Sequence, residues 1–181
     1  MYRILLSLVI IATLNSCNNK SKSIASANTL ETNDATYYLI RHADKQRGPK
    51  VGDDPVLNAK GKARAQFWAK KLKDIDFDAV YSTDFKRTRS TALPTAKKNK
   101  VPVTIYNTSD LYNEQFQSET RGKTVLIVGH SNTTPAFVNA ILGTEKFGEI
   151  DDSTFGNLYI VRVHNGVAEA ELKDFNSWNM E

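Results

Sequence analysis

The feature that most constrains the fold is the alternation of strand-like and helix-like segments between residues 36 and 172. Runs of β-branched and aromatic residues, typical of strands, alternate with stretches whose apolar residues recur at helical spacing. Segment 109–119 fits either a loop or a short helix. The expected strands are 36–40, 78–82, 101–106, 124–128, 158–163 and 167–172, and the expected helices are 58–73, 85–98 and 135–142.

This order of elements indicates an α/β fold built as a three-layer sandwich. The strand at 124–128 is apolar throughout, which is the pattern of a strand buried on both faces. The Asn-Gly pair at 165–166 separates the last two strands and is a strong hairpin signal. We therefore expect a mostly parallel central sheet with helices on both faces and an antiparallel hairpin at one edge. The 181 residues leave room for one such domain.

The amino terminus has the pattern of an export signal. Arg3 precedes an 11-residue, mostly apolar run at 4–14, which is shorter than the roughly 20 residues that a spanning helix needs. Cys17 follows at once, and Leu-Asn-Ser-Cys at 14–17 resembles a bacterial lipobox, in which the Cys is diacylated. An ordinary signal peptide with a free thiol is the alternative. More than one acyl chain gives stable anchoring.

The sequence thus predicts three parts. Residues 1–16 would be a lipoprotein signal peptide, residues 17–35 a lipidated Cys with a flexible polar tether, and residues 36–181 the folded domain. The protein would be exported and lipid-anchored to a bacterial membrane, on its periplasmic or cell-surface face.

The composition limits the kinds of functional site that the chain can contain. A net charge of +4 is a mild basic excess that does not point to nucleic acid. One Cys excludes an intrachain disulfide and a Cys-rich zinc site, and three His leave few ways to build a metal centre.

Basic residues follow three of the expected strands. Arg41 and His42 follow the first strand, Arg87 lies beyond the strand at 78–82, and His130 follows the strand at 124–128. In open α/β sheets, functional residues lie just past the carboxyl ends of the strands. Two Arg and two His at one edge suit a phosphate dianion, because Arg offers a permanently charged planar fork. One neutral His can attack phosphorus and the other can donate to phosphoryl oxygens.

Four motifs in this order resemble the histidine phosphatase superfamily, which includes the phosphoglycerate mutases and small phosphohistidine phosphatases. They are Tyr-Leu-Ile-Arg-His-Ala-Asp at 38–44, Leu-Asn-Ala-Lys-Gly at 57–61, the segment 81–92, and Val-Gly-His-Ser at 128–131. The resemblance runs from about residue 37 to 172. It implies a phosphoglycerate mutase-like fold and a metal-independent phosphatase acting on a phosphorylated small molecule or a phosphoprotein. It implies neither a metal nor an organic cofactor.

The resemblance also implies residue roles. His42 would be the nucleophile that becomes phosphorylated, and Arg41, Arg87 and His130 would complete the phosphate pocket. Water would then hydrolyse the phosphohistidine.

The general acid is less well marked. In much of the family a Glu beyond the third strand protonates the leaving group, and Glu114 is the nearest match. Asp44 and Asp84 are alternatives. This chain departs from the family pattern at Ala43, where Gly is usual, and at Ser90, where Gln is frequent.

Two other functions stay open at this point. A phosphoglycerate mutase-like phosphoryl transfer would need a pocket that keeps the phosphorylated intermediate away from water. A non-catalytic surface lipoprotein could bind anions with the same residues, although a binder needs no nucleophile.

Overall fold

The computed structural model describes residues 34–179. The expected signal peptide, the lipidation of Cys17 and nearly all of the expected tether lie outside the described residues. Strand β1 (Ala35–Arg41) begins one residue before the expected domain boundary. Within residues 34–179, no helix has the length and apolar character needed to cross a bilayer.

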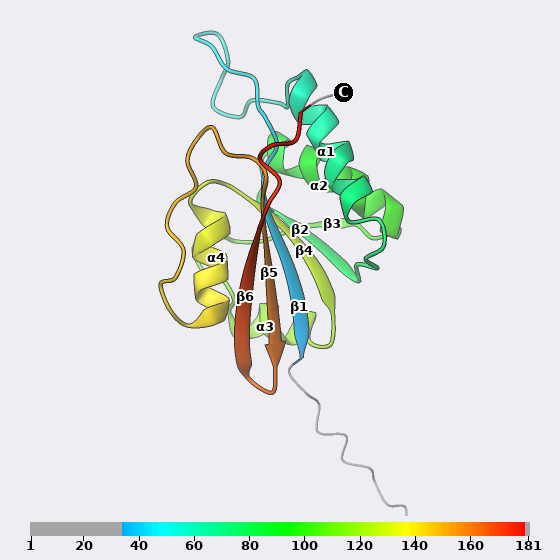
Figure 1. Cartoon of the computed structure of the whole chain (residues 1–181), viewed down its shortest axis with the longest axis vertical. Helices are drawn as coiled ribbons and strands as arrows, with labels where there is room; N and C mark the ends of the chain where they lie inside the picture. The colour runs from blue at the N-terminus through cyan, green and yellow to red at the C-terminus, as the bar shows by residue number, and fades with distance from the viewer. Residues whose placement is uncertain (1–33, 180–181) are drawn as a thin grey trace, which may run out of the picture. The chain divides into compact units, whose positions relative to one another are not determined.

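Six strands form one sheet in the order β3-β2-β4-β1-β5-β6 (Figure 1). The first four strands of that order are parallel, and β5 and β6 form an antiparallel hairpin at one edge. This confirms the expected fold class. Besides β1, the strands are β2 (Ala79–Ser82), β3 (Val103–Ile105), β4 (Thr124–Gly129), β5 (Asn157–His164) and β6 (Val167–Asp174).

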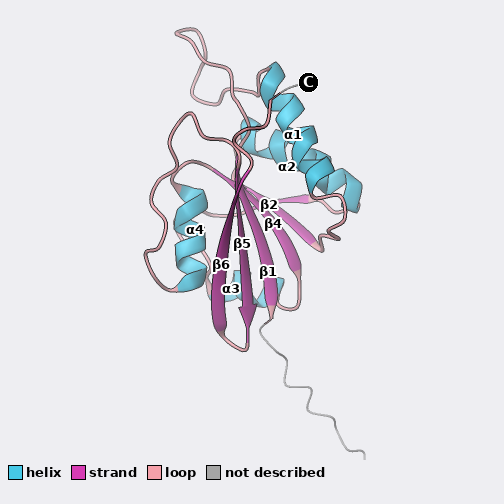
Figure 2. Cartoon of the chain, viewed as in Figure 1, coloured by secondary structure: helices cyan, strands magenta, loops and turns pink. Residues whose placement is uncertain are grey.

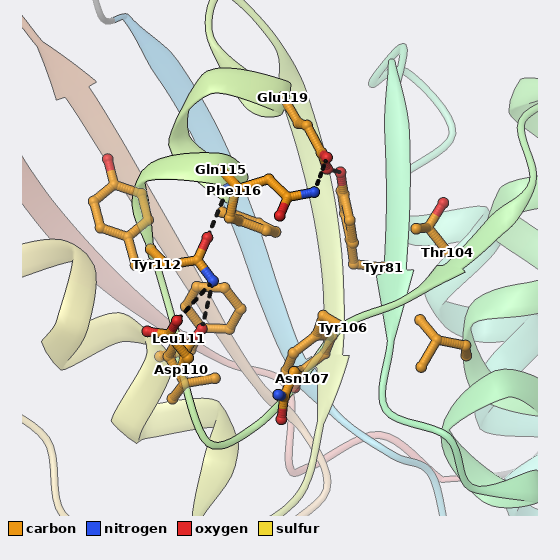
Figure 3. A pocket seen from close by; sticks show the side chains of 13 residues that line it. Tyr81, Thr104, Tyr106, Asn107, Asp110, Leu111, Tyr112, Gln115, Phe116 and Glu119 are labelled. Carbon is orange, nitrogen blue, oxygen red and sulfur yellow. Dashed lines mark hydrogen bonds between the residues drawn. The ribbon is translucent and has the colours of Figure 1, made fainter.

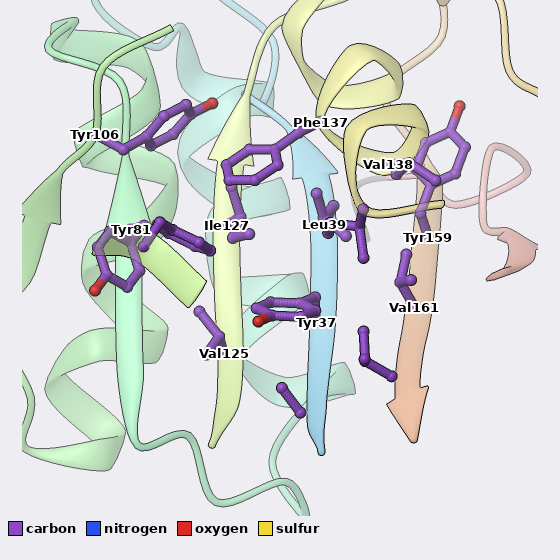
Figure 4. Packing of buried hydrophobic residues seen from close by; sticks show 14 of the residues in the cluster. Tyr37, Leu39, Tyr81, Tyr106, Val125, Ile127, Phe137, Val138, Tyr159 and Val161 are labelled. Carbon is purple, nitrogen blue, oxygen red and sulfur yellow. The ribbon is translucent and has the colours of Figure 1, made fainter. Parts of the chain in front are cut away.

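Within residues 34–179, four helices cover the two faces of the sheet (Figure 2). On one face lie α1 (Ala59–Lys71) and α2 (Lys86–Asn99), and on the other lie α3 (Glu114–Thr120) and α4 (Thr133–Leu142). The alternation along β4 divides the core: Leu126 packs with Trp68 of α1, and Ile127 packs with Phe137 of α4 (Figure 4). Burial on both faces explains why this strand is apolar throughout.

Local sequence signals set several element boundaries. The side chain of Asn58 accepts a hydrogen bond from the Gly61 amide at 2.8 Å and caps α1, as expected from the sequence. Gly143 ends α4 with a φ of 66°, in the left-handed region that glycine adopts at low cost. Asn165 and Gly166 both have positive φ, which matches the twist of the two-residue hairpin.

Several element boundaries differ from expectation by one or two residues. β3 is shorter than the segment 101–106, because Pro102 has no amide hydrogen and the Val101 amide bonds back to Ala96 of α2. The ambiguous segment contains the short helix α3, which Asn113 caps by accepting from the Phe116 amide. α4 begins two residues earlier than expected.

Candidate active site

The carboxyl ends of the parallel strands bring the four predicted basic residues together. Arg41, His42, Arg87 and His130 all line one cavity of about 390 Å³. Arg41 pairs with Gly129 across β1 and β4, and the His42 amide donates to the Gly129 carbonyl at 2.8 Å. The two imidazoles therefore leave adjacent strands side by side, with ring centroids 5.4 Å apart.

His42 is held as a neutral imidazole. The residue is 3% exposed, and Nδ1 lies 2.8 Å from the Ala43 carbonyl oxygen. A carbonyl can only accept, so Nδ1 carries the hydrogen and Nε2 keeps a lone pair. Burial lowers the pKa of His42 to about 3, helped by the nearby positive charge of Arg41. Near neutral pH this side chain is a nucleophile that needs no deprotonation.

His130 takes part in a chain of hydrogen bonds. Arg87 Nη2 donates to His130 Nδ1 at 3.3 Å, so the hydrogen lies on Nε2, which donates to Thr83 Oγ1 at 2.8 Å. Thr83 in turn donates to Thr88 Oγ1 at 2.9 Å. Burial and the charge of Arg87 lower the pKa of His130 to about 4. Its ring orientation is thus fixed from both sides.

Arg41 is almost completely buried and is held by the loop before β5. Nη1 donates to the carbonyl oxygens of Asp151 and Thr154 at 2.8 and 2.9 Å, and Nη2 donates to Asp152 at 2.7 Å. The guanidinium also stacks on the Phe155 ring, 4.4 Å from its centroid. These contacts fix the plane of the guanidinium before any ligand binds.

Several guanidinium donors in this cavity have no acceptor. Arg41 Nε, Arg87 Nε and Arg87 Nη1 are buried and meet no hydrogen-bond acceptor within residues 34–179. Arg87 Nη1 lies 3.6 Å from Asp54, beyond hydrogen-bond distance, and its guanidinium stacks on Phe85. Buried donors without acceptors are costly, so their presence favours an anion as the intended partner.

Sequence reasoning missed three charged residues of this cavity. Lys45, Glu149 and Asp152 line it as well. The sequence signal that could have indicated Lys45 as a site residue is its position three residues after His42. Burial and the charge of Arg87 lower its pKa. Glu149 and Asp152 come from the loop between α4 and β5, which carries no motif and is placed only by tertiary contacts.

The structure does not bring the predicted general acids to the cavity. Glu114 begins α3, near the end of the sheet where β1 starts (Figure 1), and lines a separate hollow with Tyr37. Asp44 accepts from Arg64 Nε at 2.7 Å in a buried ion pair and does not line the cavity. Asp84 pairs with Arg89. The structure thus places neither Glu114 nor Asp44 among the residues that line this cavity.

Two further observations describe the surroundings. A separate cavity of about 300 Å³ lies between β3 and α3, where Tyr81 donates to Glu119 at 3.3 Å (Figure 3). None of the four basic residues lines it. Among the described residues, no group of three or more His, Cys, Asp or Glu side chains is placed to hold a metal ion.

Comparisons with known proteins agree with this geometry. The family model of the histidine phosphatase superfamily (branch 1) matches residues 37–113. Over 70 residues the chain is 37% identical to phosphoserine phosphatase 1 of Hydrogenobacter thermophilus, a match that covers 36% of this chain and 33% of that protein. The chain thus matches about a third of the length of that curated relative.

Solved structures share the fold over most of the chain. The protein histidine phosphatase SixA complexed with tungstate aligns with a TM-score of 0.61 at 15% identity, covering 77% of this chain and 96% of that one. Phosphoglycerate mutase from Bacillus anthracis aligns with a TM-score of 0.58 at 16% identity, covering 81% and 94%. The chain therefore resembles the histidine phosphatase superfamily (branch 1) over residues 37–113, and it shares the fold of these two solved structures.

Proposed function

We propose that the protein is a metal-independent phosphatase that hydrolyses phosphoryl groups through a phosphohistidine intermediate on His42. One observation carries this proposal. A neutral, buried imidazole with a lone pair on Nε2 shares a cavity with guanidinium donors that have no acceptor.

Substrate binding follows from those donors. A phosphoryl dianion in the cavity would accept hydrogen bonds from Arg41 Nε and from Arg87. It would also raise the pKa of His130, because the charged imidazolium then gains an opposite charge beside it. The added proton would lie on Nδ1, which would then donate to a phosphoryl oxygen instead of accepting from Arg87 Nη2. Negative charge on that oxygen must be stabilised in the transition state.

The chemistry takes two steps. The Nε2 lone pair of His42 attacks phosphorus and the N–P bond to His42 forms. At the same time the bond from phosphorus to the leaving group breaks, a P–O bond in a phosphoester or a P–N bond in a phosphoramidate. Nδ1 keeps its hydrogen and continues to donate it to the Ala43 carbonyl oxygen, and this hydrogen bond stabilises the positive charge of the phosphorylated ring. Water then attacks phosphorus, the N–P bond breaks, and inorganic phosphate leaves with His42 restored to its neutral form.

The substrate class and the location are part of the proposal. The cavity could accept the phosphoryl group of a small molecule or of a phosphoprotein side chain. In either case that group could be a phosphoester or a phosphoramidate. From residues 1–17 alone, we propose that the protein acts outside the cytoplasm on a lipid anchor at Cys17. The similarity to a phosphoserine phosphatase over 70 residues supports phosphatase activity rather than a mutase reaction.

Turnover and covalent labelling test the mechanism together. The protein is assayed with p-nitrophenyl phosphate and with a phosphohistidine peptide in the presence of EDTA, and quenched samples are examined for an acid-labile phosphoryl group on the protein. We expect turnover and labelling with wild type, and neither with His42→Asn. His164→Asn is the matched control, because His164 is an exposed residue at the end of β5. Turnover without a label, or labelling that survives His42→Asn, would contradict the mechanism.

A further inference from the structure

We propose that Glu149 is the acid–base residue of this cavity, the group that protonates the leaving oxygen. The inference rests on the proposed phosphatase function and assigns a catalytic role that the sequence motifs place elsewhere.

Glu149 is tied to the loop that carries the second histidine. Ser131, the residue after His130, donates from Oγ to Glu149 Oε1 at 3.0 Å. The amide of the next residue, Ile150, donates to the Ser131 carbonyl at 2.9 Å, and the Ile150 side chain is buried in the core beside α4. Two hydrogen bonds and a buried anchor therefore hold the carboxyl at the cavity that contains His42.

The other carboxyl groups near this site are already engaged in ion pairs or hydrogen bonds. Glu149 and Asp152 are the carboxyl residues that line the cavity within residues 34–179. Asp152 accepts from both Arg41 and Arg47, and these ion pairs hold the pKa of Asp152 far below its usual range. A carboxyl kept so firmly ionised is a poor proton donor.

Three neighbouring carboxylates are placed for structural contacts. Asp44 is paired with Arg64 in the interior, and Asp54 caps the first amide of α2 at 2.9 Å. Asp151 accepts from the amide and the hydroxyl of Ser153. Glu149 is the carboxyl that both lines the cavity and is free of a cationic partner among the described residues.

One proton leaves Glu149 in the first chemical step and returns to it in the second. Protonated Glu149 gives its proton to the leaving oxygen as His42 Nε2 bonds to phosphorus, so an alcohol departs and Glu149 becomes a carboxylate. In the second step the carboxylate takes a proton from the attacking water. The N–P bond breaks, inorganic phosphate leaves, and Glu149 is protonated again.

Leaving-group dependence distinguishes an acid from a structural residue. An alkyl phosphate such as glycerol phosphate needs proton donation, whereas the p-nitrophenolate ion leaves unaided. We measure the rate at which His42 becomes phosphorylated, by rapid quench, with both substrates. Glu149→Gln should lower the rate with glycerol phosphate by roughly 10²–10⁴-fold, and the rate with p-nitrophenyl phosphate far less.

Two variants sharpen the test. Glu169→Gln, on the exposed edge strand β6, is the matched control and should leave both rates unchanged. Glu114→Gln examines the acid that the sequence motifs indicate and should also leave both rates unchanged.

Each contrary result overturns the inference. An equal loss with both substrates in Glu149→Gln would show a structural role, and no loss would exclude proton donation. A selective loss with glycerol phosphate in Glu114→Gln would return the role to that residue. If wild type forms no phosphohistidine with either substrate, the proposed function itself fails, so the two failures are distinguishable.

Discussion

Lowering the pH should destabilise the fold through His42 at a pH where most carboxylates are still ionised. In the folded protein the pKa of His42 is about 3, against an ordinary value of 6.5 in the unfolded chain. Below pH 6.5 the unfolded chain therefore binds a proton that the folded protein does not bind. Stability rises with pH in this window and is lost as the pH falls through 6.5.

The loss of stability follows from how far the pH lies below 6.5. Each pH unit below 6.5 costs about 1.4 kcal/mol for one proton bound only by the unfolded chain. At pH 5.0 the loss from His42 is therefore about 2 kcal/mol, a large share of the ~5–15 kcal/mol by which most domains are stable. His130, with a pKa lowered to about 4, acts in the same direction. Carboxylates of ordinary pKa contribute mainly below about pH 4.3.

Comparison with His42→Asn isolates the contribution of this one residue. Urea unfolding is followed by the fluorescence of Trp68 and Trp178 at several pH values between 7.5 and 5.0. The two proteins share His130 and every carboxylate, so the difference between their free energies of unfolding should change by about 2 kcal/mol across this range. Two parallel curves would refute the conclusion that the fold keeps His42 neutral.

Three further predictions concern packing and anchoring. Gly61→Ala should lower the free energy of unfolding in urea by about 1–3 kcal/mol, although Ala has the better helix propensity. The reason is that a Cβ at position 61 would lie 1.9 Å from the Asp44 carbonyl oxygen. Unchanged stability would contradict this close contact. Arg64→Met should cost about 3–5 kcal/mol at pH 7, because the Asp44 carboxylate would stay buried without its partner; a loss below ~1 kcal/mol would show that water reaches the carboxylate. Cys17→Ser should move the full chain from the membrane to the soluble fraction of cells, and retention in the membrane fraction would count against lipidation.

The fold and the meeting of the four basic residues in one cavity were predictable because each depends on short-range patterns. Strand and helix periodicities predicted the elements, with β3 shortened by Pro102 and α4 extended to Thr133. Parallel strands present their carboxyl ends at one edge, so residues just after β1 and β4 had to meet. The structure confirms that His42 and His130 lie side by side.

The acid–base residue could not be predicted in this way. The family pattern indicated Glu114, but α3 begins near the opposite end of the sheet from the cavity. Asp44 follows the His42 motif closely in sequence, and its ion pair with Arg64 of α1 keeps it out of the cavity. Neither fact can be predicted from the local sequence, because each depends on how a helix packs against the sheet.

The sequence by itself determined the α/β architecture, the edge of the sheet that carries the chemistry, and the two His and two Arg that meet there. Those features follow from periodicity along the chain and from the direction of parallel strands. Only the tertiary structure decided which carboxyl groups join them. The loop between α4 and β5 brings Asp152 to Arg41 across 111 positions of sequence and Glu149 to Ser131 across 18. Contacts of that kind are set by the packing of a loop against the ends of the strands, and no local pattern records them.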